Sequence, residues 1–280
     1  MIQAIKADRY YLENLHEIKT LGSKDEFPRP RWEDGTPAHS YFITQVFEKY
    51  NLAHGEFPLT TLRNTATKKG IAEILWIYQK QSNELKVIRE MGVDWWDNWN
   101  VGDDTIGKRY GYVVKELELI DNLLKGLKED PFGRRHIMNL WQEEYMEGPG
   151  LKPCAYETLW SCRKVNGKIY LDLTLNQRSN DYIMAGYINK IQYVALQMMI
   201  ANSLGYEIGN FVHFVQNLHV YDRHVEAMYE LLKKEPLNIQ PKLILKRDKG
   251  FNFFDYTVDD FVITGVKEIT KIKSPLEIAV

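Results

Sequence analysis

The chain has 280 residues, of which 44% are hydrophobic, so it can bury the core of one large domain. Its 36 basic and 38 acidic residues leave a formal net charge of -2, which argues against a protein that coats nucleic acid or an anionic membrane. Two cysteines are too few for a disulfide framework, and no apolar stretch reaches the roughly 20 residues that span a bilayer. We therefore expect a cytoplasmic protein with no membrane partner and no obligate nucleic acid. Residues 1–280 could form one large domain or two, and no break in composition forces a split.

Helical periodicity of the apolar residues predicts four helices. The segments with this pattern are residues 2–21, 67–81, 116–131 and 188–204. The last is apolar on nearly all sides and closes at Gly205, so we expect it to be a central buried helix. Between the first two, residues 26–39 are too rich in proline, glycine and charge for regular structure. They are expected to form a loop that carries Arg29 and Arg31.

The second predicted helix contains a carboxylate, Glu73, among apolar side chains. A buried carboxylate without partners is costly, and it usually responds with a raised pKa or by finding hydrogen-bond donors. A solvent-facing glutamate fits the same pattern equally well. The periodicity alone therefore leaves both positions open for Glu73.

Alternating and β-rich runs in the second half of the chain predict strands. They are residues 134–141, 156–165, 168–179 and 210–221, with short runs at 256–266 and 276–280. The strand from residue 168 collects polar side chains, among them Asn176 and Arg178, on a face that is polar enough to line a cavity. By the same period of two, His219 and Tyr221 share one face of the later strand and could project into that space.

One cysteine, Cys154, directly follows a proline, between a Gly/Pro-rich turn at 147–153 and the strand at 156–165. Proline restricts the backbone around it, so the thiol stands at a loop-to-strand junction, where a nucleophile can be presented. A free cysteine is more often a small buried hydrophobe, and this interpretation stays open for Cys154. Cys162, in the middle of the strand, is expected to pack in the core.

Neighbouring arginines suggest an anion site, because a guanidinium can bind phosphate through two hydrogen bonds. On a strand, Arg134 and Arg135 would point to opposite faces, so one of them would have to reach a shared anion from a neighbouring subunit. Arg178 is a third candidate, with the hydroxyl of Ser179 beside it. Each arginine is also compatible with a solvated surface charge.

Two further features have the chemistry of a ligand site. Trp95, Trp96 and Trp99 stand close together among charged and amide residues, which fits an aromatic wall for a flat ligand about as well as it fits core packing. Asn189 carries a donor and an acceptor on one amide, which can pair with O4 and N3–H of a uracil ring. An asparagine near a helix start is also a common cap.

Ten short stretches follow one another along the chain: DGTPAH, FPLTT, EILWI, WWDNW, RYGY, DPFGRRHI, LKPCAYET, QRSND, YINKIQY and LHVYDRH. Together they resemble the thymidylate synthase family over most of the chain, and within it the short Bacillus type. The resemblance implies an α/β (α+β) enzyme, a single domain with a large mixed sheet covered by helices and a central buried helix. It also implies a homodimer in which each active site takes arginines from the partner subunit.

The chemistry implied by the resemblance is the reductive methylation of dUMP to dTMP. Cys154 would add as a thiolate to C6 of dUMP, and 5,10-methylenetetrahydrofolate would supply both the one-carbon unit and the hydride, leaving dihydrofolate. No metal and no nicotinamide would take part. The alternative is a folate-dependent hydroxymethylase of dUMP or dCMP with the same fold, in which water instead of hydride traps the methylene group.

The resemblance also implies roles for individual residues. The catalytic residues would be Cys154, Glu73, Tyr110, Arg178, Asp181 and Asn189. Those that bind dUMP would be Arg29, Gln177, Arg178, Ser179, Asn189, His219 and Tyr221, with Arg134 and Arg135 contributed by the partner subunit. The folate would contact Trp96, Trp99, Asp181, Ala279 and Val280, and the short C-terminus would close over it as a lid. Arg31 competes with Arg29 for the phosphate.

Three stretches depart from the common pattern of the family. They are QNLH at 216–219, AGYIN at 185–189, and TTLR, in which Leu62 replaces a lysine expected near the glutamate tail of the folate. If these changes have an effect, we expect it in folate affinity and in the hydride step.

Overall fold

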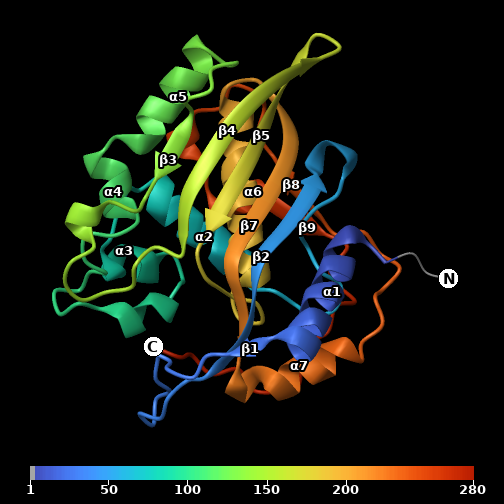
Figure 1. The fold of residues 1–280 in the computed structure, drawn as a ribbon. Coiled ribbons are helices and arrows are strands. Elements are labelled where there is room, and N and C mark those ends of the chain that lie inside the picture. The colour runs from blue at the N-terminus through green and yellow to red at the C-terminus, as the bar shows by residue number, and fades with distance from the viewer. Residues whose placement is uncertain (1–3) are drawn as a thin grey trace.

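The computed structural model describes residues 4–280, and its centre is a seven-stranded mixed sheet (Figure 1). The strand order is β1-β2-β7-β5-β4-β3, with β6 paired to β7. β5 and β6 run parallel to β7, and the other pairs are antiparallel. The strands are β1 (Ser23–Lys24), β2 (Ser40–Asn51), β3 (Ile137–Asn139), β4 (Ala155–Val165), β5 (Lys168–Gln177), β6 (Asn180–Asp181) and β7 (Glu207–Tyr221). A separate hairpin pairs β8 (Lys242–Leu245) with β9 (Phe261–Thr264).

Helices cover one face of the large sheet, and the opposite face of β4, β5 and β7 is turned toward the viewer in Figure 1. The helices are α1 (Lys6–Leu21), α2 (Thr67–Tyr78), α3 (Leu85–Glu90), α4 (Gly111–Glu116), α5 (Leu119–Glu129), α6 (Gly186–Ser203) and α7 (Val225–Leu232). α6 runs behind the sheet, packs against α2 and buries most of its side chains. The prediction of a mixed sheet with a central buried helix is confirmed.

A side-chain amide fixes α6 to the sheet. The parallel pair of β5 and β7 shifts register between Leu171 and Leu173, which interrupts the regular ladder of backbone hydrogen bonds. Gln197 is fully buried on α6, and its Nε2 donates to the carbonyl oxygens of Leu171 at 2.8 Å and Asn210 at 3.0 Å. These carbonyl groups are thereby satisfied where the ladder is irregular.

The predicted helices are present as α1, α2, α5 and α6, although residues 2 and 3 of the first prediction lie outside the described part of the chain. The strand predicted at 134–141 is wrong in extent, because a turn precedes it, in which the Gly133 N–H donates to the Asp130 carbonyl at 3.0 Å. Arg134 and Arg135 therefore lie on the loop before β3, and strand alternation does not apply to them.

Two other strand predictions need correction. The run at 256–266 narrows to β9, and residues 276–280 form no strand. Instead, Val280 exchanges backbone hydrogen bonds with Arg31, at 2.9 and 2.7 Å, and this pairing holds the C-terminus beside the loop at 26–39.

Within residues 4–280, we find no helix that is both long enough and apolar enough to cross a membrane.

Candidate active site

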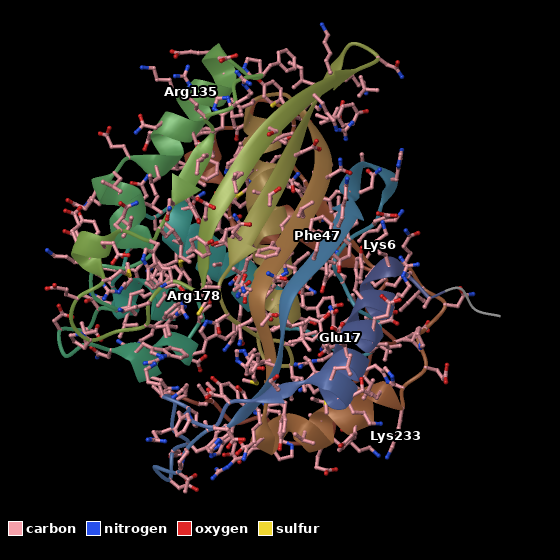
Figure 2. The ribbon with its side chains drawn as sticks, in the orientation of Figure 1. Lys6, Glu17, Phe47, Arg135, Arg178 and Lys233 are labelled. Carbon is pink, nitrogen blue, oxygen red and sulfur yellow. The ribbon has the colours of Figure 1, made fainter. Side chains whose placement is uncertain are left out.

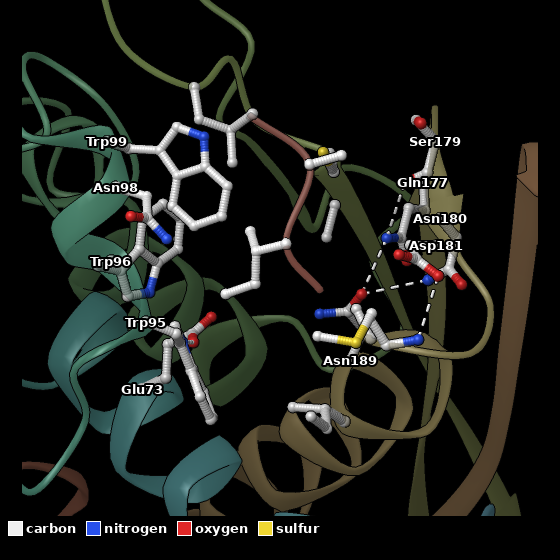
Figure 3. A pocket seen from close by; sticks show the side chains of 18 of the residues that line it. Glu73, Trp95, Trp96, Asn98, Trp99, Gln177, Ser179, Asn180, Asp181 and Asn189 are labelled. Atoms are coloured by element: carbon white, nitrogen blue, oxygen red, sulfur yellow. Dashed lines mark hydrogen bonds between the residues drawn. The ribbon is translucent and has the colours of Figure 1, made fainter. Parts of the chain in front are cut away.

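One cavity of about 580 Å³ lies at the ends of β5 and β7, beside the first turn of α6 (Figure 3). Its walls also include side chains of α2, of the short helical turn Trp95–Trp99 and of the loop before β4, together with residues 278–280. Cavities of several hundred cubic ångströms with mostly apolar walls and a few polar groups are typical of small-molecule sites. Segments far apart in the sequence thus form one candidate binding site.

Arg178 places positive charge beside the Cys154 thiol. Its Nη2 lies 3.6 Å from Sγ, and its Nε and Nη2 donate to the carbonyl oxygens of Pro153 and Lys152, each at 2.9 Å. Burial raises the pKa of the Cys154 thiol, while the charges of Arg178 and Arg29 oppose that rise. Arg178 therefore acts on the thiol in the expected direction, but desolvation outweighs it and the pKa stays raised overall.

Tyr110 adopts a strained backbone conformation next to the thiol. Its φ is +47°, a region that is costly for a residue with a side chain and is often found at functional sites. Its hydroxyl accepts a hydrogen bond from the backbone N–H of Cys154 at 3.1 Å. Burial raises the pKa of Tyr110 well above its ordinary value, so the phenol keeps its proton at neutral pH.

Glu73 is buried, 7% exposed, and it lines the cavity from α2. The indole N–H of Trp95 donates to its Oε2 at 2.5 Å. Burial raises the pKa of Glu73, and the hydrogen bond from Trp95 offsets part of that rise. The interpretation of Glu73 as a solvent-facing glutamate is therefore wrong, and the carboxyl group is placed to hold a proton at higher pH than an ordinary glutamate.

Three amide side chains hold the side chain of Asn189. Its Oδ1 accepts from Nε2 of Gln177 at 3.0 Å and from Nδ2 of Asn180 at 3.1 Å (Figure 3). Its Nδ2 donates to Oε1 of Gln192 at 3.0 Å. His213 in turn contacts Oε1 of Gln177 at 2.8 Å. Asn189 lies inside the first turn of α6 and is not its capping residue, so the interpretation as a cap is wrong. The network fixes the direction in which this amide faces the cavity.

The end of β7 carries two rings on one face, as the alternation predicted. The rings of His219 and Tyr221 lie edge to face with centroids 5.0 Å apart, and both residues line the cavity. Burial lowers the pKa of His219, which keeps the imidazole neutral at pH 7. Asp181, the register partner of His219 on β6, accepts the backbone N–H of Met184 at 3.1 Å.

Tryptophan side chains form the wall of the cavity that lies opposite Asn189 (Figure 3). The rings of Trp96 and Trp99 lie edge to face with centroids 5.5 Å apart, and Trp96 packs against Tyr110 at 5.2 Å. Trp96 is 5% exposed and belongs to the core, yet both tryptophans also line the cavity. The two interpretations of this cluster, core packing and an aromatic wall, therefore both hold.

Most of the predicted site residues meet in this cavity. The lining includes Arg29, Glu73, Trp96, Trp99, Tyr110, Cys154, Gln177, Arg178, Ser179, Asp181, Asn189, His219, Tyr221, Ala279 and Val280. Arg134 and Arg135 are exposed and do not line the cavity, and Figure 2 shows Arg135 far from Arg178. Between the two candidate loop arginines, Arg29 lines the cavity and Arg31 does not.

One other expectation about the lining is wrong. The polar face of β5, including Asn176, is turned away from the cavity, and the strand reaches it only with Gln177 at its end and Arg178 just beyond. Leu62, which stands where a lysine was expected near the folate tail, is 1% exposed and packs in the core.

Two polar contacts of the site were missing from the prediction, those of Trp95, which was expected only as part of an aromatic wall, and of Gln192. Trp95 donates directly to Glu73, and Gln192 links Asn189 to the neighbourhood of the same carboxyl group. Gln192 follows Asn189 by three residues on a helix, which places both on one face, so the spacing could have indicated it. No sequence spacing indicates which of three clustered tryptophans faces Glu73.

Comparison with known proteins gives the same family throughout. The family model described as thymidylate synthase matches residues 9–278. A thymidylate synthase of Streptococcus pneumoniae (strain 70585) is 49% identical over 259 residues, which cover 91% of this chain and 93% of that protein. One of Streptococcus suis (strain 05ZYH33) is 48% identical over 267 residues, 94% of this chain and 96% of that protein.

Among solved structures, the thermostable thymidylate synthase A from Bacillus subtilis superimposes with a TM-score of 0.87 at 33% sequence identity, over 98% of this chain and 99% of that chain. The relatives named here are synthases, which favours the synthase over the hydroxymethylase alternative. These matches extend over nearly the whole chain, including the segments that form the cavity. The chain belongs to the thymidylate synthase family and is a methyltransferase.

Proposed function

We propose that this chain converts dUMP and 5,10-methylenetetrahydrofolate to dTMP and dihydrofolate, with Cys154 as the nucleophile. The observation that carries the proposal is the position of the Cys154 thiol, 3.6 Å from a guanidinium nitrogen of Arg178, in the same cavity as Glu73 and Asn189. The folate supplies the one-carbon unit and the two electrons that the methyl group requires.

The nucleotide would bind through charge at one end and an amide at the other. A guanidinium has five N–H donors, and the contacts of Arg178 to Pro153, Lys152 and Cys154 engage its Nε and Nη2. Both N–H donors of Nη1 are left for a phosphate, which Arg29 and the hydroxyl of Ser179 would also bind.

The amide of Asn189 would pair with O4 and N3–H of the uracil ring, and N3–H would replace one of the two donors, Gln177 or Asn180, that now bond to Oδ1. Its direction is already fixed by Gln177, Asn180 and Gln192, so little conformational entropy is lost when the base binds. His219 and Tyr221 would contact the deoxyribose hydroxyl from the end of β7. A neutral imidazole suits that role, because it can both donate and accept a hydrogen bond.

The covalent step would form a bond from Cys154 Sγ to C6 of dUMP. Phosphate neutralises part of the positive charge near the thiol, while Arg178 stays within reach of Sγ and favours the thiolate. Addition at C6 places negative charge on C5 and O4, and Glu73, with its raised pKa, can hold a proton on that side of the ring. Tyr110 is placed to take part in removing the C5 proton.

The folate would lie between the tryptophans and the chain end. Trp96 and Trp99 offer aromatic faces, Asp181 offers a carboxylate, and Ala279 and Val280 form the opposite side of the cavity. Aromatic faces and a hydrogen-bonding carboxylate fit a flat ring that carries N–H donors. The contact of Val280 with Arg31 holds the chain end close to the loop at 26–39, which also carries Arg29.

We also propose that the chain is a homodimer formed through the sheet face that is turned to the viewer in Figure 1. Phe47 on β2 and Ile137 on β3, both on that face, are 56% and 49% exposed, and Phe214 stands next to Phe47 in the register (Figure 2). Exposed apolar side chains on one sheet face are typical of an interface. A partner on this face would bring its Arg134 and Arg135 toward the other subunit.

Two smaller proposals accompany these. Residues 1–280 would form one domain, which is supported by a family match over 9–278. A cytoplasmic location is supported by Cys154 and Cys162, which are both free thiols.

The deciding experiment is a turnover assay with dUMP and 5,10-methylenetetrahydrofolate. Formation of dihydrofolate and dTMP in equal amounts supports the proposal. Formation of tetrahydrofolate and 5-hydroxymethyl-dUMP would instead identify a hydroxymethylase. No product from dUMP or dCMP would contradict both.

A further inference from the structure

A buried ion pair lies behind the nucleotide site, outside the residues that line the cavity. Nζ of Lys190 is 2.6 Å from Oε2 and 2.8 Å from Oε1 of Glu48, and the two residues are 0% and 1% exposed. Lys190 directly follows Asn189 on α6, whereas Glu48 belongs to β2. The pair therefore joins the helix that carries Asn189 to a strand on the far side of β7.

The surroundings of the pair satisfy both charges, which a buried ion pair requires. The Glu48 carboxylate accepts three further hydrogen bonds, from the hydroxyl of Tyr50 at 2.5 Å, the hydroxyl of Tyr182 at 3.0 Å and Nδ2 of Asn14 at 3.1 Å. The Lys190 ammonium lies 4.1 Å from the ring centroid of Tyr187 and 4.9 Å from that of Tyr182. Burial lowers the pKa of Lys190, and the Glu48 charge opposes this effect.

The same contacts tie down both ends of the segment 180–190. At one end, Tyr182, the residue after Asp181, donates a hydrogen bond from its hydroxyl to Glu48. At the other end, Lys190, the residue after Asn189, donates to the same carboxylate. In addition, Nδ2 of Asn180, at the start of the segment, donates to Asn189 Oδ1 near its end. One carboxylate on β2 thus anchors the segment from behind, while Asn189 and Asp181 face the cavity.

We propose that Lys190 and Glu48 are positioning residues for the pyrimidine: their ion pair fixes the segment 180–190, so that the Asn189 amide meets the base edge in one orientation. The inference rests on the proposed binding of dUMP. Neither residue touches the cavity, and each acts through the segment that it anchors.

The test uses the double variant Lys190→Met/Glu48→Gln. It removes both charges together, so no buried charge is left unpaired. With its amide oxygen in the place of Oε1, the new glutamine would still accept the hydrogen bonds of Tyr182 and Asn14, and its amide nitrogen could donate to the Tyr50 hydroxyl, which can rotate to accept. Methionine approximates the volume of lysine. We expect a folded dimer whose dissociation constant for dUMP, measured by calorimetry without folate, rises by about tenfold. The ratio of kcat/KM for dUMP to that for dCMP should fall as well, because a mobile amide reads the edge less selectively.

The matched control is Gln197→Met. Gln197 is also fully buried on α6 and also tethers it, to Leu171 and Asn210, but it lies two turns beyond Asn189. This variant should lower the melting temperature while its dissociation constant for dUMP stays within about twofold of the parent. If the double variant does not fold, Lys190→Met alone provides the test, because the Glu48 carboxylate keeps its three other hydrogen-bond donors. A smaller rise is expected, since the bond from Tyr182 remains.

The possible outcomes distinguish a failure of the proposed function from a failure of the positioning role. If the unaltered protein does not bind dUMP, the proposed function fails. If it binds dUMP and the double variant binds equally well, the positioning role is refuted and the function stands. If Gln197→Met weakens dUMP binding as much as the double variant does, the effect is a general loss of helix stability, and the positioning role is again refuted.

Discussion

At the scale of single residues, the Cys154 thiol has a raised pKa although a guanidinium lies beside it. An isolated thiolate in this cavity would be costly, so ionisation is best coupled to the bound substrate and its attack on C6. Replacing the sulfur should separate binding from chemistry, because the phosphate and base contacts belong to other side chains. We therefore expect Cys154→Ser to lose more than about a thousandfold in kcat, with little change in dUMP affinity.

That prediction is checked by single-turnover kinetics together with calorimetric titration of dUMP. Cys162→Ser is the control, since Cys162 lies on β4 outside the cavity. Substantial turnover by Cys154→Ser would rule out the covalent role. Loss of dUMP binding in the same variant would show that the sulfur also supports the ground-state complex.

Glu73 leads to a prediction about pH. Burial raises its pKa in the folded state above the ordinary value of 4.5. The folded protein therefore holds this proton more tightly than the unfolded chain, and the cost of ionising Glu73 appears as the pH rises from 4.5 through the raised pKa. Glu73→Gln removes that cost, so it should gain stability relative to the parent as the pH increases.

Melting temperatures of both proteins at several pH values test this sign. The difference between variant and parent should be small near pH 4.5 and should grow toward neutral pH. In the same variant kcat should fall by about a hundredfold or more, since glutamine cannot exchange a proton. A stability difference that shrinks as the pH rises would contradict the raised pKa.

Single residues of the site could be predicted from the sequence where they belong to a local motif, and not where their role depends on contacts that are distant in the chain. Cys154, Arg178 and Asn189 stand in contiguous motifs, so the resemblance located them, and the cavity brings them together. Whether Glu73 is buried or exposed could not be predicted, because α2 is apolar on nearly every side. The Lys190–Glu48 pair joins residues 142 positions apart, and no local pattern indicates such a contact.

At the scale of elements, the start of α4 depends on a close backbone contact. A Cβ on Gly111 would lie 2.1 Å from the carbonyl oxygen of Ser82, which is backbone and cannot move aside cheaply. The preceding residue, Tyr110, has φ +47°, so the strained turn that carries its hydroxyl lies directly against this contact. Gly111→Ala should therefore cost more than about 3 kcal/mol and displace the Tyr110 hydroxyl.

Urea denaturation measures that loss, and the kcat of any folded fraction measures the displacement. Gly92→Ala is the matched control, because Gly92 has φ +80° but nothing within 4 Å of an added Cβ. Left-handed strain alone should cost it about 1 kcal/mol. Equal losses in the two variants would mean that the contact with Ser82 is not decisive.

The C-terminal segment depends on a second element, the turn after β7. The Arg223 guanidinium bonds to Glu277 at 2.7 Å and to Asp34 at 2.6 Å, and it lies 4.9 Å from the ring centroid of Trp32. It thus joins the base of the tail to the loop at 26–39. Arg223→Ala should raise the KM for the folate by about threefold to tenfold and leave dUMP affinity nearly unchanged, because exposed ion pairs are individually weak.

Steady-state kinetics at low and high salt test this role. Screening should raise the folate KM of the parent toward that of the variant, because the ion pairs are exposed. Arg247→Ala removes the same charge from another ion pair, with the buried Asp260 at 2.7 Å, outside the cavity lining. It should leave the folate KM unchanged. A matching rise in Arg247→Ala would attribute the effect to net charge.

Elements were predicted well where the apolar pattern is decided by local contacts. The amphipathic α5 and the alternating β5 have one period throughout, and both are present. β2 was not predicted, since its side chains alternate in burial only over part of its length. The tail at 276–280 has the composition of a strand, but its one pairing, Val280 with Arg31, is set by the position of the chain end against a distant loop.

At the scale of the whole molecule, one subunit accounts for all the predicted cavity residues except Arg134 and Arg135. Both are exposed on the loop before β3. No reasoning on a single chain can place them in a site, because the contact would depend on how two copies meet. Strand alternation had suggested a shared anion for one of them, but that premise is wrong because both lie on a loop. The sequence resemblance is the remaining indication that they act in a partner.

Subunit exchange can test whether they do. Cys154→Ser and Arg135→Ala proteins should each be nearly inactive as homodimers. When the two are denatured together and refolded, half of the dimers are mixed, and in each mixed dimer one site combines the intact cysteine with an intact partner arginine. Activity should then recover to about a quarter of the parent value. If Arg135 served the site of its own subunit, both sites of every mixed dimer would be defective and no activity would return.

Loss of activity is also expected if Phe47→Asp, on the exposed sheet face, leaves a folded monomer, because a single chain has no partner to supply the arginine.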